Sequence, residues 1–155
     1  MTGFFLAILI AQASPNPIAS ASPLPAPTLS PAWVKRPLDG KYDYARFARR
    51  EQDGTESEIS AARQVCDCQP PVALSMVQLA LSSVPGVAIT RGPITICGQA
   101  AQRLIATGLA APGKPSKNIE AILFRREPAL YTFTYTFLSA APAADAESAL
   151  SALCP

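Results

Sequence analysis

The clearest pattern along the chain is a strict alternation of aromatic and threonine side chains near the C-terminal end. Within Leu130–Leu138 the aromatic residues share one face and the threonines share the other (Tyr131, Phe133, Tyr135 and Phe137 against Thr132, Thr134 and Thr136). Successive side chains of a strand point to opposite faces, so this period of two predicts a β-strand. Each aromatic side chain can bury about 150–250 Å². We expect this face to form core, with a ligand-stacking platform as the alternative.

Two segments further upstream form a predicted β-hairpin. Tyr42–Glu51 and Thr55–Val65 flank Gln52-Asp53-Gly54, and Asp-Gly between two strand-like segments is a strong hairpin signal. Alternate positions of the second arm are only partly apolar (Ile59, Ala61, Arg63 and Val65). The pattern therefore predicts two antiparallel strands joined by a tight turn.

The period changes to that of a helix after Pro71, a residue that is well tolerated in the first turn because its missing N–H has no helical partner there. Val72–Val84 carries a narrow polar stripe beside a broad apolar side (Ser75, Gln78 and Ser82 against Leu74, Val77, Leu81 and Val84), which predicts a helix on an apolar surface. Pro85-Gly86 ends it. A second helix is predicted over Ala144–Leu153, with Asp145 and Glu147 in the first turn, where the helix dipole favours negative charge.

Further strands complete the predicted fold. Two segments rich in β-branched residues, Val87–Thr90 and Ile94–Cys97, flank Arg91-Gly92-Pro93, which we interpret as a turn. A further strand is predicted over Gln102–Thr107. The last predicted pair joins Ile119–Arg125 to Leu130–Leu138 around Glu127-Pro128. The order of elements predicts the α+β class: a mostly antiparallel sheet, one helix before the central strands, and one C-terminal helix packed on the sheet.

The N-terminal segment is uncharged and indicates export. Phe4–Ala11 is a short apolar run, and small residues suit a signal-peptide cleavage site after Ala13 or Ala21. We therefore predict a signal peptide over residues 1–21 and a Pro/Ala/Ser-rich linker over residues 22–40, followed by one domain over residues 41–155. Eight apolar residues cover only about 12 Å of a hydrocarbon core about 30 Å thick, so no membrane span is expected in the mature chain. A disordered cytosolic tail is the alternative interpretation.

Charge and composition exclude several kinds of function. The chain has 13 basic and 11 acidic residues, and they are interspersed, so no surface is built for nucleic acid. It has no histidine, which removes the commonest general base and metal ligand. Carboxylates are few and scattered, Asp39, Asp67 and Glu120 among them, and there is no Gly-rich phosphate loop. We therefore expect neither catalysis nor a cofactor or metal.

The chain resembles exported bacterial domains of the PsbP-like family. The resemblance rests on Ile94-Thr95-Ile96-Cys97-Gly98, the helix before it, the YTFTYTF strand and the closing SALSALC segment, and it covers residues 40–155. It implies a mostly antiparallel sheet with helices on its faces. It also implies a scaffold of the kind whose members mostly bind or help to assemble other proteins.

The four cysteines are the remaining reactive residues. An even count in an oxidising compartment suggests two disulfides, and we favour Cys97–Cys154, which would fix the last helix to the sheet, together with Cys66–Cys68. Crossed pairings remain open. A zinc site is the first alternative, but a single C-x-C with two distant cysteines lacks the usual ligand spacing. The second is thiol–disulfide exchange through Cys66-Asp67-Cys68, because Cys68 lies just before the predicted helix.

The sequence thus predicts an exported, non-catalytic small domain, periplasmic or secreted, that acts by binding or assembly. The expected partner is an envelope or extracellular protein or a small ligand. Thiol–disulfide exchange is the alternative function.

Overall fold

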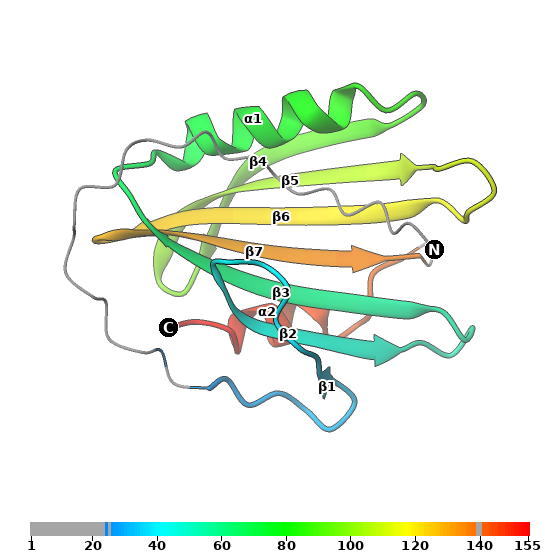
Figure 1. Ribbon diagram of the computed structural model, residues 1–155, viewed down its shortest axis with the longest axis horizontal. Coiled ribbons are helices and arrows are strands. Elements are labelled where there is room, and N and C mark those ends of the chain that lie inside the picture. Colours follow the sequence, from blue (N-terminus) through cyan, green and yellow to red (C-terminus); the bar gives the residue numbers. More distant parts are fainter. Residues whose placement is uncertain (1–23, 25, 139–140) are drawn as a thin grey trace.

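One antiparallel sheet organises the molecule. The computed structural model describes residues 24, 26–138 and 141–155, so the predicted signal peptide lies outside the described residues. Seven strands pair in the order β1-β2-β3-β7-β6-β5-β4 (Figure 1). In chain order the elements are β1 (Val34–Lys35), β2 (Asp43–Arg50), β3 (Glu56–Val65), α1 (Pro70–Ser82), β4 (Ala88–Ile96), β5 (Gln99–Leu109), β6 (Lys117–Arg126), β7 (Ala129–Phe137) and α2 (Ala146–Ser151).

The predicted α+β class is wrong, because the described residues form a mainly β protein. Helix α1 has 13 residues, and α2 has only 6, against the longer predicted segment Ala144–Leu153. The two strands that follow α1 are correspondingly longer than predicted, with nine residues in β4 and eleven in β5. None of the helices among the described residues has the length and apolar character needed to cross a membrane.

The error arises at Arg91-Gly92-Pro93, which lies inside β4 and forms no turn. β4 is an edge strand that pairs only with β5. Proline is compatible with an edge because its missing N–H can point away from the neighbouring strand. The true turn is Cys97-Gly98, where both residues have positive φ (54° and 68°), as a two-residue hairpin turn of the right twist requires. Sequence reasoning placed the turn at the stronger Gly-Pro signal.

The aromatic face of β7 forms the main core, as predicted. Tyr131, Phe133, Tyr135 and Phe137 are all buried, together with Phe47, Ile59 and Ile122 from neighbouring strands. The rings of Phe124 and Tyr131 stack with their centroids 5.1 Å apart. Helix α2 contributes Ala146, Ala149 and Leu150 to this core. The ring faces are thus covered by protein, which favours core over an aromatic platform.

Helix α1 packs on the opposite face of the sheet. Its buried residues Leu74, Val77 and Leu81 contact Leu104 of β5 and Leu123 of β6 within a second, smaller core. Figure 1 shows α1 lying along the β4–β6 side of the sheet. These are three of the four residues that the helical periodicity placed on the apolar side; the fourth, Val84, lies beyond the end of α1. Helix α1 therefore covers the part of this sheet face that β5 and β6 form.

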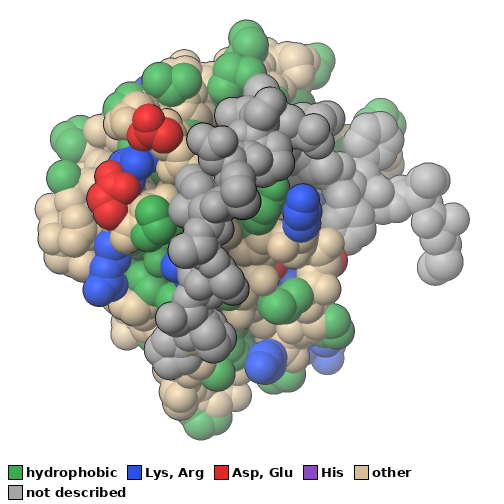
Figure 2. Space-filling model, turned by 60° about the vertical axis from the view of Figure 1, so that its left-hand side comes forward, with side chains coloured by type: hydrophobic (Ala, Val, Ile, Leu, Met, Phe, Trp, Pro, Cys, Tyr) green, Lys and Arg blue, Asp and Glu red, His purple; other side chains and the backbone are tan. Residues whose placement is uncertain are grey.

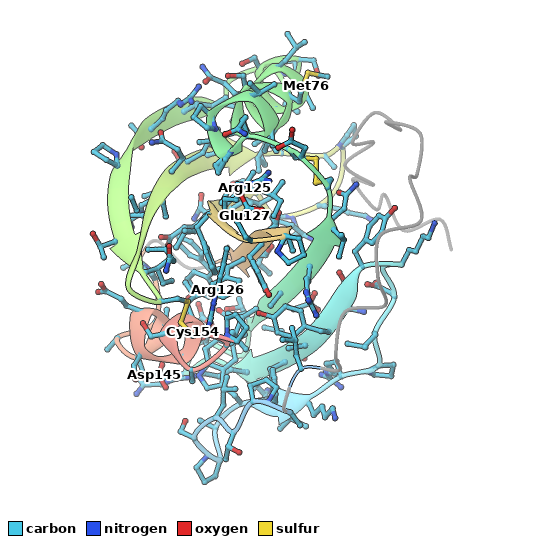
Figure 3. All side chains as sticks on the ribbon, turned by 90° about the vertical axis from the view of Figure 1, so that its left-hand side faces the viewer. Met76, Arg125, Arg126, Glu127, Asp145 and Cys154 are labelled. Carbon is cyan, nitrogen blue, oxygen red and sulfur yellow. A yellow bond between two sulfur atoms is a disulfide. The ribbon has the colours of Figure 1, made fainter. Side chains whose placement is uncertain are left out.

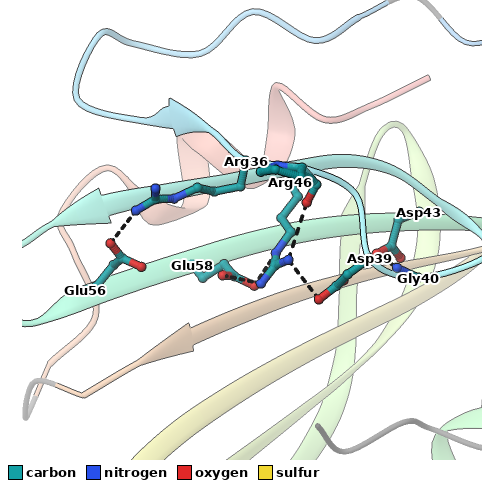
Figure 4. Close-up of polar contacts among 8 residues, drawn as sticks. Arg36, Asp39, Gly40, Asp43, Arg46, Glu56 and Glu58 are labelled. Carbon is teal, nitrogen blue, oxygen red and sulfur yellow. Dashed lines mark hydrogen bonds and ion pairs between the residues drawn. The ribbon is translucent and has the colours of Figure 1, made fainter. Parts of the chain in front are cut away.

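The segment before β2 belongs to the folded structure. Trp33 is 5% exposed in the main core, and β1 pairs with β2. Arg46 of β2 forms ion pairs with Asp39 at 2.8 Å and with Glu58 of β3 at 2.9 Å (Figure 4). The division into a linker, residues 22–40, and a domain, residues 41–155, stays a prediction. The structure adds that contacts from residues 33–39 reach the sheet.

We expect Trp33→Ala to lower the free energy of unfolding by about 3–5 kcal/mol, because it removes a buried ring from the core. Chemical denaturation of both proteins would measure the change. Val34→Ala is the matched control, since Val34 is 59% exposed and surface substitutions usually change stability by less than about 0.5 kcal/mol. Equal effects of the two substitutions would contradict the placement of Trp33 in the core.

Candidate functional site: a cavity beneath the C-terminal helix

A cavity of about 310 Å³ lies between α2 and strands β4, β5 and β6. Its apolar walls come from Ile94 and Ile96 of β4, Ile122 of β6 and Leu150 of α2. This volume is at the lower end of the range of about 300–1,000 Å³ that is usual for ligand pockets. The cavity can therefore hold a small molecule or one side chain of a partner.

Three charged side chains line the same cavity: Arg103, Glu120 and Glu147. Nε of Arg103 lies 2.8 Å from Oε1 of Glu120, but its N–H makes no well-aligned hydrogen bond. Glu120 is only 9% exposed, whereas Glu147 is exposed. Two carboxylates and one guanidinium leave one negative charge in excess when all three groups are ionised.

The cavity perturbs the carboxyl group of Glu120. Burial raises the pKa of Glu120 above its usual value, because the charged form loses hydration. The Arg103 guanidinium acts in the opposite direction, and the negative charge of Glu147 adds to the increase. Burial outweighs the ion pair in this balance. Burial therefore favours the protonated form of Glu120 despite the ion pair with Arg103.

Contacts at both ends of α2 hold the roof of the cavity in place. At the C-terminal end, Cys154 forms a disulfide with Cys97 in the β4–β5 turn, with the two Cα atoms 5.4 Å apart. The hydroxyl of Tyr44 donates a hydrogen bond to the carbonyl oxygen of Leu153 at 2.8 Å. Burial raises the pKa of Tyr44 far above its usual value, so this hydroxyl remains a donor.

The N-terminal end of α2 is fixed through Asp145. Its carboxylate accepts a hydrogen bond from Nε1 of Trp33 at 3.3 Å and forms an ion pair with Arg49. Just before it, the backbone N–H of Ala143 donates to the hydroxyl of Tyr135 at 2.9 Å. Asp145 and Cys154 lie at the α2 end of the molecule, far from Met76 on α1 (Figure 3). Strands β2 and β7 and the β4–β5 turn therefore all help to position one short helix.

The structure joins the other two cysteines, Cys66 and Cys68, in a second disulfide on the α1 side of the sheet. Both backbone carbonyl oxygens accept hydrogen bonds from Arg125, at 3.2 and 3.0 Å. The connectivity is the one that the sequence favoured. It brings Cys97 and Cys154 next to the cavity and leaves Cys66 and Cys68 away from it.

The geometry gives limited support to thiol–disulfide exchange at Cys66 and Cys68. A helix N-terminus lowers a thiol pKa through its free backbone N–H groups. Helix α1 begins with Pro70 and Pro71, which have no N–H, so two of these donors are missing. No side-chain hydrogen bond caps the helix at Gln69 either.

Helix α1 also presents an apolar stripe to solvent. Val72, Met76 and Leu79 are 65%, 48% and 70% exposed and recur at the spacing of one helix face. Figure 2 shows hydrophobic side chains at the top of the molecule. Helix α1 also lies at the top in Figure 1, and the two views differ only by a turn about the vertical axis. Acidic and basic side chains lie next to one another lower on the same view. No charged residue occurs within α1 itself.

Sequence reasoning missed the cavity residues. Glu120 was one of several scattered carboxylates, and Arg103 and Glu147 carried no motif. One signal was present: Glu120, Ile122 and Phe124 alternate along β6, so Glu120 shares the face of two buried apolar residues. A charge at such a position marks a buried polar site. Among the described residues, no group of three or more cysteine, aspartate or glutamate side chains could hold a metal ion.

Comparisons with known proteins identify the fold only. No family model matches the chain, and no curated protein matches its sequence, so membership in the PsbP-like family stays a prediction. The solved structure of LpqN, described as involved in cell envelope biogenesis of Mycobacterium tuberculosis, is similar with a TM-score of 0.52 and 15% identity, over 81% of this chain and 75% of LpqN. A protein of unknown function from Pseudomonas aeruginosa, described as a putative regulator, gives a TM-score of 0.44 and 23% identity, over 70% and 68% of the two chains.

The two disulfides should differ strongly in their effect on stability. Removing Cys97–Cys154 with the double substitution Cys97→Ser and Cys154→Ser opens a loop with a sequence separation of 57, which the chain-entropy model values at about 4 kcal/mol. The Cys66–Cys68 loop has a separation of 2, so the corresponding double serine variant should lose much less. Chemical denaturation would compare the two variants. Thiol titration of denatured, unreduced wild type should find no free thiol, and four free thiols would contradict both disulfides.

The stability of the Glu120→Gln variant relative to wild type should increase as the pH rises. Because the folded-state pKa of Glu120 is raised, its contribution to stability is complete below the unfolded pKa and is lost as the pH rises through the folded pKa. Glutamine keeps the uncharged state at every pH. The difference in Tm between the variant and wild type should therefore increase from pH 4 to pH 7 in thermal unfolding. A decrease over this interval would show that the ion pair with Arg103 outweighs burial.

Proposed function

We propose that this protein is an exported, non-catalytic domain of the cell envelope that binds a ligand in the α2 cavity. The observation that carries the proposal is the combination of apolar walls with a buried carboxyl group, that of Glu120, which pairs with Arg103. Ligand pockets are typically apolar with a few placed polar groups. Here the polar groups lie under a short helix that is fixed to the sheet at both ends.

Several features support export. Phe4–Ala11 has the character of a signal-peptide core, with possible cleavage after Ala13 or Ala21. All four cysteines are paired, which is typical of proteins from oxidising compartments. The fold is shared with LpqN, which is described as involved in cell envelope biogenesis. A likeness at 15% identity supports a common scaffold and transfers no partner.

The chemistry of the cavity supports binding in preference to catalysis. The chain has no histidine, so a proton transfer would depend on Glu120, Glu147 or groups from the ligand. Glu120 is buried and already occupied by Arg103, and Glu147 is exposed and close to solvent. The site is better suited to holding a ligand.

The test uses protein isolated from the envelope fraction of its source organism and analysed by intact and native mass spectrometry. We expect a mature chain that begins at Ser14 or Ser22, as cleavage after Ala13 or Ala21 requires, with two disulfides and a non-covalent adduct that denaturation removes. Ser151→Phe, which places a ring at the cavity wall, should abolish the adduct. Ser148→Phe, on the same helix but outside the cavity lining, is the matched control.

Different outcomes separate the parts of the proposal. A full-length chain in the cytosolic fraction would contradict export. An exported protein with no adduct, or one whose adduct survives Ser151→Phe, would contradict binding in the cavity. A protein partner that is captured equally by wild type and Ser151→Phe would place the binding surface elsewhere on the domain.

A further inference from the structure

The α2 cavity continues into a second hollow of about 220 Å³ along the edge strand β4. The hollow is lined by consecutive residues of β4 and by two residues of β5 (Thr90, Arg91, Gly92, Pro93, Arg103 and Ile105). The lining of the cavity begins at the next β4 residue, Ile94, and includes the same Arg103. Alternate residues of a strand share a face, so Gly92 and Ile94 lie on the α2 side of the sheet, about 7 Å apart. The cavity and the hollow therefore form one continuous space, the β4 groove, and Arg103 lies where they meet.

The hollow lies over a residue that has no side chain. Gly92 pairs with Arg103 of β5 in a register without shifts, and its φ is not among the positive values found at the turn glycines. A Cβ added to Gly92 would meet no heavy atom of the rest of the described chain within 4 Å. Neither backbone conformation nor packing within the domain therefore requires glycine here, although glycine weakens a strand. Such a glycine is typical of a place where another molecule approaches the backbone closely.

Arg103 supplies hydrogen-bond donors at the junction of the cavity and the hollow. Its Nε lies 2.8 Å from Oε1 of Glu120, and its side chain is 40% exposed. Neither of its two terminal nitrogens makes a well-aligned hydrogen bond within the described residues. The other arginine of the hollow is directed away, because Nη1 of Arg91 donates to Ser75 and Gln78 of α1 at 3.2 Å each. A guanidinium has five N–H donors, so Arg103 has donors left for a ligand in the groove.

The charges at this junction favour an uncharged ligand. Glu120 is the buried carboxyl group of the groove and is already paired with Arg103, so the two ions compensate each other. A carboxylate ligand would be repelled by Glu120, and an ammonium ligand would compete with Arg103 for the same oxygen atoms. Glu147 is exposed, and solvent screens its charge. A carbonyl oxygen can accept a hydrogen bond from Arg103 without changing this balance.

We propose, on the basis of the proposed function, that the β4 groove binds an uncharged acyl compound, an amide or ester with an alkyl group on each side of its carbonyl. The acyl chain lies in the α2 cavity against Ile94, Ile96 and Leu150. The carbonyl oxygen accepts a hydrogen bond from a terminal nitrogen of Arg103. The second alkyl group lies in the hollow over Gly92. Together the cavity and the hollow fall well inside the range of about 300–1,000 Å³ that is usual for ligand pockets.

The experiment titrates the mature wild-type chain with N-methylhexanamide, N-butylhexanamide, hexanoate and hexylamine. Shifts of backbone amide signals measure binding and locate each probe. We expect the butyl amide to bind about tenfold more tightly than the methyl amide, because three further methylene groups become partly buried over Gly92. Both amides should bind more tightly than either charged probe. Methyl hexanoate, compared with N-methylhexanamide in a further arm, distinguishes an ester from an amide as the natural source of the carbonyl group.

Gly92→Val tests the extension of the groove over β4, and Ala88→Val is the matched control. Both substitutions place a valine on the same face of β4, but only residue 92 lines the hollow. Valine is favoured in strands, so Gly92→Val should keep or raise the Tm. It should remove the tenfold advantage of N-butylhexanamide and leave the affinity for N-methylhexanamide unchanged. Ala88→Val should change neither affinity.

Arg103→Lys tests the hydrogen bond to the carbonyl group. Lysine keeps a positive charge beside Glu120, but its single ammonium does not reproduce the planar fork of guanidinium donors. We expect both amides to bind about tenfold more weakly to this variant, as loss of a hydrogen bond from a charged group implies. Arg91→Lys is the matched control, since the side chain of Arg91 is bound to α1, and both affinities should stay unchanged in it.

The outcomes distinguish this inference from the proposed function. If N-butylhexanamide gains nothing over N-methylhexanamide, or if Gly92→Val and Ala88→Val act alike, the inference fails. Tighter binding of hexanoate or hexylamine, or unchanged binding by Arg103→Lys, would also overturn it. If the amides do not bind but wild type carries an adduct that Ser151→Phe removes, the α2 cavity remains a ligand site and only this inference fails. If no probe binds and there is no such adduct, both proposals fail.

Discussion

The structure depends on covering the aromatic face of β7, and the chain does this with a helix of only six residues. An isolated helix of this length has no stability of its own in water, because nucleation costs more than a few hydrogen bonds return. Helix α2 therefore forms only where other contacts hold it. The disulfide of Cys97 with Cys154, the hydrogen bond from Tyr44, and the contacts of Asp145 with Trp33 and Arg49 supply these constraints.

The same constraint explains why a cavity exists at this place. A helix of six residues, fixed at both ends, packs its buried residues Ala146, Ala149 and Leu150 onto the core and cannot fill the whole space above β4–β6. The space that remains reaches Arg103 and Glu120. The cavity is thus a consequence of how the end of the chain is anchored.

Local patterns predicted most of this fold, whereas its long-range features did not follow from them. The alternation in Tyr131–Phe137, the Asp53-Gly54 turn and the apolar side of α1 are all determined by neighbouring residues, and each was found. Pro93 was misread because its compatibility with a strand depends on β4 being at the edge of the sheet. The cavity residues were missed for a related reason: Arg103, Glu120 and Glu147 meet only after three separate elements have packed together. The wrong fold class has the same origin, since the extra strand length lies in β4 and β5.

The link between the disulfide and the cavity gives the predicted export a structural consequence. Disulfides such as Cys97–Cys154 persist mainly in oxidising compartments, and this one anchors the C-terminal end of the cavity roof. Under reducing conditions α2 would keep only the Tyr44 and Asp145 contacts, which are weaker than a covalent bond. Residues that form the roof, Glu147 and Leu150, would then be held less firmly above Glu120. The proposed ligand site requires its polar groups at fixed positions, so under this proposal closure of the Cys97–Cys154 disulfide and formation of a competent cavity would be steps of the same folding process.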